Sequence, residues 1–172
     1  MKYFLTLPQD KAKLKKLKAG DEVFLSGTVY AMRDKAHALL LAEKIFPLDF
    51  KDAVIYYMGP TPSRPGRPTG ACGPTTSSRM DKYTPTLLKK TSIIGIIGKG
   101  ERNAQASMAM KGRCVYFLAY GGLGALYAQR ILKSEAVLYK NLGAEAVFKL
   151  KADKFPLIVA QDIKGNTVYG GR

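Results

Sequence analysis

Hydrophobic and polar positions along the chain predict a series of strands. Residues 21–31 (DEVFLSGTVYA) alternate between apolar and polar side chains and are rich in β-branched and aromatic residues, which indicates a strand. Residues 53–58 and 92–97 are short, mostly apolar runs of the kind found in strands buried on both faces. Further strands are expected at residues 115–119 and near residues 136–139, 144–150 and 156–160.

Helices are predicted between several of these strands. The longer ones are expected at residues 33–45 and 123–132, with shorter helical turns within residues 74–81 and 83–90. A first helix behind Pro8 turns Leu14 and Leu17 inward and its lysines toward solvent. Alternating strands and helices predict an α/β fold. A length of 172 residues fits one domain spanning residues 1–172.

The charge of the chain adds information about its partners. Lys and Arg number 28 against 13 Asp and Glu, which gives a net charge of +15. Such an excess predicts an anionic partner, and nucleic acid, an acidic protein and an anionic metabolite all qualify. Residues 111–117 (KGRCVYF) are only weakly similar to an RNA-recognition strand, because Arg113 stands where an aromatic residue is required.

Cysteine and histidine usage excludes several kinds of site within this chain. Cys72 and Cys114 are far apart and form no Cys-x-x-Cys motif, which argues against a disulfide framework and a self-contained zinc or iron–sulfur site. His37 is the single histidine, so a multi-histidine metal site is excluded and a packing role is favoured over catalysis. No segment approaches the roughly 20 apolar residues of a membrane span, and we expect a soluble cytoplasmic protein.

Polar and cationic residues gather where three predicted strands end. Arg33 lies at a strand-to-helix turn, Thr75 and Arg79 lie in a hydroxyl-rich segment at a helix start, and Lys99 stands between two glycines. Because sites in open α/β sheets form at the carboxyl ends of strands, these residues are expected to converge on an anion. The alternative to an anion site is that these residues cap helices and that their cations lie in solvent. Each segment taken alone is equally compatible with both interpretations. The residues around Lys99 do not form a P-loop, which disfavours nucleotide hydrolysis.

Specific motifs surround these candidates. They are GPTP at residues 59–62, PGRP at 65–68, CGPTTS at 72–77, RMD at 79–81 and IGKG at 97–100. The set resembles the β subunit, or C-terminal domain, of class I fumarases and of the related L(+)-tartrate dehydratases. The resemblance covers essentially the whole chain.

This resemblance implies a swivelling β/β/α domain with a mixed sheet. In the family such a domain closes over a [4Fe–4S] cluster held by a separate α subunit or domain, so this chain is expected to provide no metal ligand. The implied reaction is the reversible hydration of fumarate to malate. Thr75 is implied as the catalytic acid/base group, and Arg33, Arg79 and Lys99, together with Thr75, as the substrate-binding residues.

The resemblance also implies a partner and a substrate class. We expect a hetero-oligomer with the cluster-bearing α subunit, with a homodimer as the alternative when the chain is isolated, and no binding to nucleic acid or membrane. The stretch at residues 80–85 (MDKYTP) is more similar to fumarases than to tartrate dehydratases, so tartrate is the alternative substrate. Cys72 departs from the family, in which a small residue such as Ala or Ser is expected. A basic nucleic-acid-binding module is the alternative from a different functional class.

Overall fold

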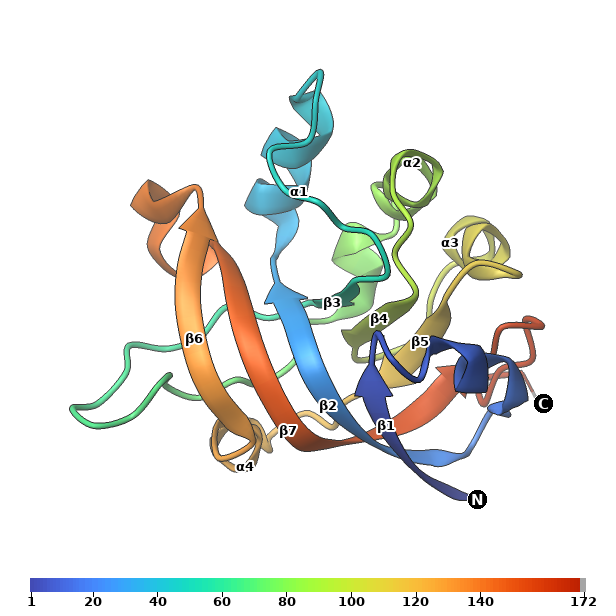
Figure 1. The fold of residues 1–172 in the computed structure, drawn as a ribbon. Coiled ribbons are helices and arrows are strands. Elements are labelled where there is room, and N and C mark those ends of the chain that lie inside the picture. Colours follow the sequence, from blue (N-terminus) through green and yellow to red (C-terminus); the bar gives the residue numbers. More distant parts are fainter. Residues whose placement is uncertain (171–172) are drawn as a thin grey trace.

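The computed structural model describes residues 1–170, and its seven strands form one mixed sheet (Figure 1). Five of these strands close into a ring. The strands are β1 (Lys2–Leu7), β2 (Glu22–Ala31), β3 (Val54–Tyr56), β4 (Gly95–Gly98), β5 (Val115–Leu118), β6 (Ile131–Leu138) and β7 (Val147–Gln161). Their order is β1-β2-β3-β4-β5-β7-β6, and β2 also pairs with β7, which closes the ring. Strands β1 to β5 pair with one another in parallel, whereas β7 is antiparallel to β2, β5 and β6.

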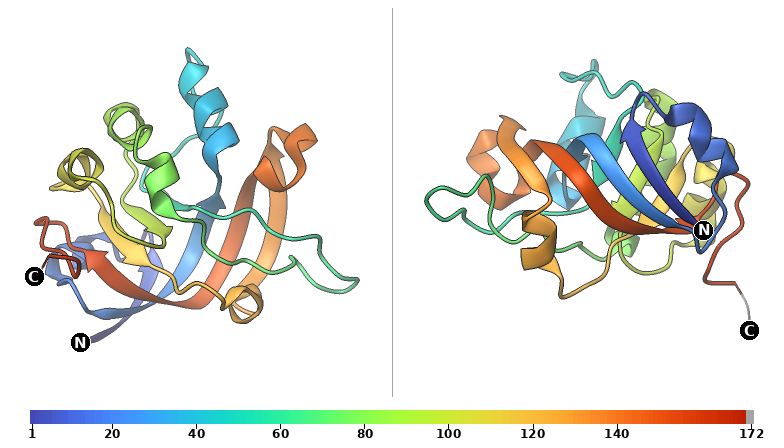
Figure 2. Two further views of the ribbon diagram at one scale, coloured as in Figure 1. Left: turned by 180° about the vertical axis from the view of Figure 1, so that it is seen from behind. Right: turned by 60° about the horizontal axis from the view of Figure 1, so that its bottom comes forward.

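Three α-helices stand together on one side of the sheet and a fourth lies at the opposite end (Figures 1 and 2). The α-helices are α1 (Asp34–Ala42), α2 (Thr84–Lys90), α3 (Ala104–Met110) and α4 (Gly124–Ala128), and the 3-10 helices are η1 (Lys11–Lys16), η2 (Ser77–Met80) and η3 (Lys140–Glu145). The predicted α/β fold with a mixed sheet is confirmed. Residues 171 and 172 of the expected domain lie outside the described residues. No helix within residues 1–170 is long and apolar enough to cross a membrane.

The ring separates two hydrophobic cores. Val54 and Tyr56 of β3 belong to the core inside the ring, whereas Ile55 and Tyr57 belong to the core beneath α1, α2 and α3. Successive side chains of a strand point to opposite faces, so a strand with a core on each side must be apolar throughout. This explains why residues 53–58 form an uninterrupted apolar run.

Several elements differ from the sequence-based predictions. Strand β1 was not predicted, the first helix is only the 3-10 helix η1, and α4 is shorter than the predicted 123–132, because Ile131 already begins β6. The two strands expected at residues 144–150 and 156–160 are one 15-residue strand, β7. The β2–β7 pairing shifts register near Gly27, and such a bulge lets a long strand bend around a closed ring.

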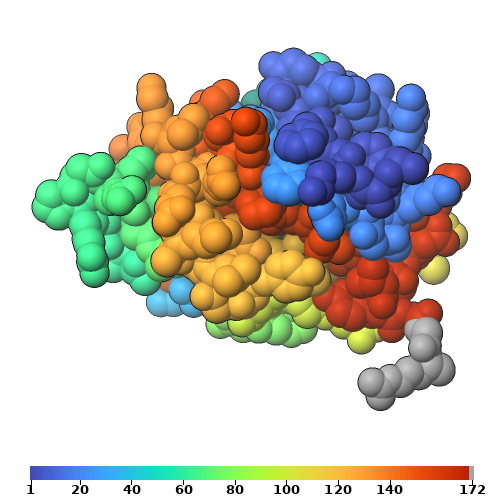
Figure 3. All heavy atoms as spheres, turned by 90° about the horizontal axis from the view of Figure 1, so that it is seen from below, coloured from blue at the N-terminus to red at the C-terminus, as the bar shows by residue number. Residues whose placement is uncertain are grey.

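The proline-rich and glycine-rich loop at residues 59–73 projects from the side of the molecule, as the green segment in Figure 3 shows. Its base is closed because Ala71 N donates to Thr61 Oγ1 at 2.8 Å and Thr61 N donates to Ala71 O at 3.2 Å. At its tip Arg67 N donates to Arg64 O at 3.0 Å, and Gly66 has a φ of 76°. Pro65 and Gly66 thus occupy the two central positions of a type II turn, which requires positive φ at the second.

Candidate functional site

The candidate residues gather at the carboxyl ends of the parallel strands. Arg33 lies two residues beyond β2, and Lys99 directly follows β4. The Lys99 ammonium lies 3.6 Å from the position that a Cβ on Gly121 would take, beyond the end of β5. Arg33 and Lys99 therefore lie beyond the carboxyl ends of parallel strands of one sheet, the position at which sites form in open α/β sheets.

Residues 73–77 are tied across the ends of β3 and β4. Thr75 N donates to Tyr57 O at 2.7 Å, Ser77 N donates to Lys99 O at 2.9 Å, and Thr76 forms a parallel bridge with Lys99. Thr75 precedes η2, which begins at Ser77, so Thr75 and Arg79 do not lie on one helix. The backbone of Thr75 is held by the sheet, and its half-buried hydroxyl makes no hydrogen bond within residues 1–170.

Two glycines permit the close approach of these segments. A Cβ on Gly98 would collide with Ser77 Oγ and lie 3.2 Å from the Tyr57 ring. A Cβ on Gly59 would lie 2.7 Å from Arg33 Cδ. Neither glycine has a positive φ, so the requirement at both positions is for space, not for backbone conformation.

Replacing Gly98 with alanine is expected to displace residues 75–77 from the end of β4. The added methyl group overpacks a buried contact with Ser77, so the free energy of unfolding should fall by about 1–3 kcal/mol. Chemical denaturation measures this loss, with Gly170→Ala as the control. Gly170 also has no positive φ, and a Cβ there would meet only Thr167 Cγ2 at 3.5 Å, an ordinary contact. Equal stability of Gly98→Ala and the wild type would contradict the packing argument.

The three candidate cations differ in their partners. Arg33 Nη2 lies 2.8 Å from Glu145 Oε1 in a partly buried ion pair. Arg79 is exposed on η2 and Lys99 is half-buried, and neither forms an ion pair within residues 1–170. A cation without a neutralising partner within the described residues, such as Lys99 at the end of β4, is a favourable environment for an anion.

A buried polar network holds the segment that carries Arg79. Arg102 is 7% exposed and forms an ion pair with Asp81. Its Nη2 donates to Thr84 Oγ1 at 2.7 Å, and its guanidinium lies 5.4 Å from the Tyr57 ring centroid. Asp81 also accepts a hydrogen bond from Asn103 N at 2.8 Å. Because Asp81 directly follows η2, this network fixes the helix that carries Arg79. Sequence reasoning did not identify Arg102 or the Asp81 pairing.

His37 is a packing residue, as the sequence favoured. It is fully buried, lies 5.8 Å from the Tyr83 ring in a stacked arrangement, and its Nδ1 hydrogen-bonds Arg33 O at 2.7 Å. Burial lowers the pKa of His37 to about 4, so the ring is neutral near pH 7. Its Nε2 is buried and unpartnered within the described residues.

Protonation of His37 is expected to destabilise the fold. Its pKa is about 4 in the folded protein and 6.5 in the unfolded chain, so the stability contribution is complete above about pH 6.5 and is lost as the pH falls toward 4. The free energy of unfolding should decrease by about 1 kcal/mol between roughly pH 7.5 and 5.5, a range in which most carboxylates do not titrate. Urea titrations of the wild type and His37→Gln test this, because the variant should lose the pH dependence. An equal slope in both proteins would exclude His37 as the cause.

Neither cysteine is placed as a metal ligand. Cys72 and Cys114 are buried in different cores, and burial raises the pKa of both thiols, that of Cys114 to about 12. A thiolate is the form that binds iron or zinc, so these thiols are poor ligands. Cys72 instead donates to Gly70 O at 3.3 Å, in keeping with a space-filling role. Residues 1–170 contain no group of three His, Cys, Asp or Glu side chains that could hold a metal ion.

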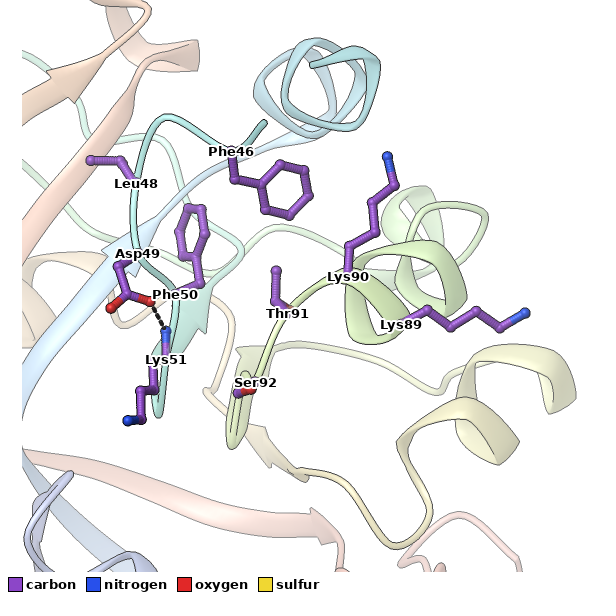
Figure 4. A pocket seen from close by; sticks show the side chains of 9 residues that line it. All are labelled: Phe46, Leu48, Asp49, Phe50, Lys51, Lys89, Lys90, Thr91 and Ser92. Atoms are coloured by element: carbon purple, nitrogen blue, oxygen red, sulfur yellow. Dashed lines mark hydrogen bonds between the residues drawn. The ribbon is translucent and has the colours of Figure 1, made fainter. Parts of the chain in front are cut away.

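One surface hollow lies away from these candidates. It has a volume of about 560 Å³ and is lined by Phe46, residues 48–51 and residues 89–92, which precede β3 and β4 (Figure 4). It therefore lies at the amino ends of these strands, whereas Thr75 and Lys99 lie at their carboxyl ends. Lys89 points away from the hollow (Figure 4), whereas Lys90 Nζ lies 5.7 Å from the ring centroid of Phe46. The candidate site is consequently an open sheet edge and not this hollow.

Comparison with known proteins shows the family of the chain. The chain matches the family described as "Fumarase C-terminus" over residues 3–171. The chain belongs to this family. Members similar to it include the anaerobic class I fumarate hydratase of Escherichia coli K12, at 36% identity over 164 residues, and fumarate hydratase 1, mitochondrial, of Leishmania major, at 32% identity over 169 residues. The resemblance stated from the motifs is thus confirmed.

The lengths of these family members differ. The match covers 92% of this chain but only 30% of the Escherichia coli enzyme, and 95% against 31% for the Leishmania major enzyme. A Methanocaldococcus jannaschii protein named "Putative L(+)-tartrate dehydratase subunit beta" is 36% identical over 170 residues, which cover 92% of this chain and 87% of that protein. This chain therefore corresponds to about a third of the fumarases and to most of the β subunit.

Proposed function

We propose that this chain is the substrate-binding β subunit of a hydro-lyase that reversibly hydrates fumarate to malate. The observation that carries the proposal is the placement of Arg33, Thr75 and Lys99 on one sheet edge, with Arg79 on the adjoining helix η2. The family membership of the chain supports the same reaction class. Fumarate is favoured over tartrate by the fumarase-like residues 80–85, and tartrate remains the alternative substrate.

The cations would bind and orient the dicarboxylate. Planar guanidinium groups such as those of Arg33 and Arg79 can hold a carboxylate through two parallel hydrogen bonds, whereas Lys99 contributes a point charge. When malate loses its C3 proton, negative charge spreads onto the adjacent carboxylate. Positive groups fixed at that position stabilise the developing charge without reorganising during the reaction.

Thr75 would transfer the proton at C3. In dehydration the C3–H bond breaks and its proton passes to the Thr75 oxygen, while the electron pair of that bond forms the C2=C3 double bond. The C2–O bond breaks, and the departing hydroxide would become water by taking a proton from an acidic group of the partner. A threonine hydroxyl is a weak base, so a carboxylate of the partner would take the hydroxyl proton of Thr75. The absence of a hydrogen bond from Thr75 Oγ1 within residues 1–170 supports this assignment, because the hydroxyl is available to both substrate and partner.

A [4Fe–4S] cluster would be held by a separate α subunit. The buried cysteines of this chain do not fit such a group, and the similarity to a protein named as a β subunit supports a second chain. We propose a cytoplasmic hetero-oligomer in which residues 1–172 form one swivelling domain that closes over the partner. The +15 charge supports an acidic partner surface and attraction of a dianion.

The proposal is tested by mixing the chain anaerobically with its cluster-loaded partner. Fumarate formation from malate is followed by absorbance, with each subunit alone as a control. Activity in the mixture alone is the expected result. Activity with tartrate but not malate would change the substrate and keep the reaction class, whereas inactivity with both would reject the hydro-lyase assignment.

A further inference from the structure

Arg33 is held by one acidic side chain that comes from a distant part of the sequence. Arg33 Nη2 lies 2.8 Å from Glu145 Oε1, and the two side chains are 26% and 17% exposed. Glu145 is the last residue of η3, and Arg33 immediately precedes α1. The pair therefore joins two segments that flank the same edge of the sheet.

The guanidinium is also confined sterically. A Cβ on Gly59 would lie 2.7 Å from Arg33 Cδ, 3.1 Å from Arg33 Nη1 and 2.5 Å from Ala144 O. Gly59 is thus packed against both Arg33 and the residue preceding Glu145. On the main chain, His37 Nδ1 hydrogen-bonds Arg33 O at 2.7 Å and anchors the start of α1. The backbone of Arg33 is therefore held by His37, and its side chain is held by Glu145 and by the close approach of Gly59.

The ion pair leaves part of the guanidinium available. Glu145 contacts it through Oε1, while Glu145 Oε2 and Arg33 Nε are buried and have no hydrogen-bond partner within the described residues. Asp34 Oδ1 lies 4.0 Å from Arg33 Nε, beyond hydrogen-bonding distance. Nη1 makes no hydrogen bond within residues 1–170 and is not among the buried unpartnered atoms. A bidentate ion pair would occupy two N–H donors of the guanidinium group. The single contact with Glu145 instead orients the guanidinium and leaves Nη1 free.

We propose that Glu145 is a positioning residue that aims Arg33 at one carboxylate of the substrate. This inference rests on the proposed function. The negative charge of Glu145 would repel a dianionic substrate, so Glu145 contributes through geometry and not through charge. It restricts the rotation of the Arg33 side chain before the substrate binds. Glu145 touches neither substrate nor the reacting atoms and acts through Arg33.

The first test observes Arg33 directly and needs no turnover. In NMR spectra of the full chain, the Arg33 Nε–Hε signal is assigned from its loss in Arg33→Lys. The signal should change position or broaden in Glu145→Ala, and it should stay close to the wild-type position in Glu145→Gln, which keeps the Oε1 acceptor. Glu43→Ala is the control for Glu145→Ala and should leave the signal unchanged. Glu43 is an exposed acid that accepts a hydrogen bond from Tyr139 at 3.2 Å. An unchanged Arg33 signal in Glu145→Ala would overturn the proposal.

The second test measures kinetics with the partner subunit present. Glu145→Ala should lower kcat/KM for malate about 10- to 100-fold, mainly through KM, because Arg33 would lose the charged contact that orients it for binding. Glu145→Gln should recover most of this loss. In an Arg33→Ala background, Glu145→Ala should change kcat/KM less than about twofold, because the two residues act as one unit. A loss of the same size in both backgrounds would refute a role through Arg33.

The two proposals can fail separately. If the wild-type mixture converts malate but Glu145→Ala has wild-type kinetics, the positioning role is wrong and the hydro-lyase assignment stands. If the wild-type mixture is inactive with malate and tartrate, the hydro-lyase assignment fails. The NMR signal of Arg33 then still decides whether Glu145 orients the guanidinium.

Discussion

Replacing Thr75 with valine is expected to lower turnover of the reconstituted enzyme about 100- to 10,000-fold, the usual contribution of a positioned acid/base group. Valine has nearly the shape of threonine but cannot accept or donate a proton. Thr75 is held through its backbone N–H to Tyr57 O, which valine keeps, and its hydroxyl has no hydrogen bond within residues 1–170. Folding and KM should therefore change much less than kcat. Steady-state kinetics with malate and thermal denaturation measure the two effects.

Thr76→Val is the matched control for Thr75→Val. Thr76 is the next residue, is exposed, and is bridged to Lys99 through its backbone, so both substitutions remove a hydroxyl from the same segment. Turnover by Thr76→Val should stay close to that of the wild type. Similar activity in the two variants, whether high or low, would mean that Thr75 has no special part in the reaction.

Replacing Asp81 with asparagine is expected to reduce the free energy of unfolding by about 3–5 kcal/mol. Asp81 is 2% exposed and accepts hydrogen bonds from both Arg102 Nε and Asn103 N. The substitution leaves the buried guanidinium of Arg102 without a counter-charge and sets an amide group against N–H donors. Equilibrium unfolding in urea measures the change. The double variant Asp81→Leu/Arg102→Met should lose less stability, because no uncompensated charge remains.

The exposed ion pair between Lys2 and Glu22 provides the control for Asp81→Asn. Their charged atoms are 3.6 Å apart, and both side chains are more than half exposed. Glu22→Gln should change stability by less than about 1 kcal/mol, since water screens such pairs. If Asp81→Asn were equally mild, the Asp81–Arg102 pair would not be a main support of η2 and α3.

The amino-acid sequence determined the elements whose pattern is local. The alternation at residues 21–31 produces β2. The apolar run at residues 53–58 contains β3 and the run at 92–97 contains β4 except its last residue, because a strand buried on both faces has no polar side. The glycines around Lys99 and the strand-to-helix turn at Arg33 also indicated sites by local pattern alone. The motifs in the loop at residues 59–73 and beyond were sufficient for the family.

Other elements were not predicted because their signals depend on distant partners. Strand β1 has an exposed side that includes Phe4 and pairs with β2 alone, so its pattern is weak. Strand β7 is continuous because it pairs with β2, β5 and β6 in turn, and the register shift near Gly27 accommodates its bend. Neither effect can be derived from the residues of β7 alone.

The tertiary structure alone decided which side chains support the candidate residues. The sequence by itself indicated Arg33, Thr75, Arg79 and Lys99 as candidates. The tertiary structure pairs Arg33 with Glu145 and Asp81 with Arg102, and it places residues 75–77 across the ends of β3 and β4. Hydrogen bonds and ion pairs act over about 3 Å, and only folding brings residues so far apart in the chain to that distance.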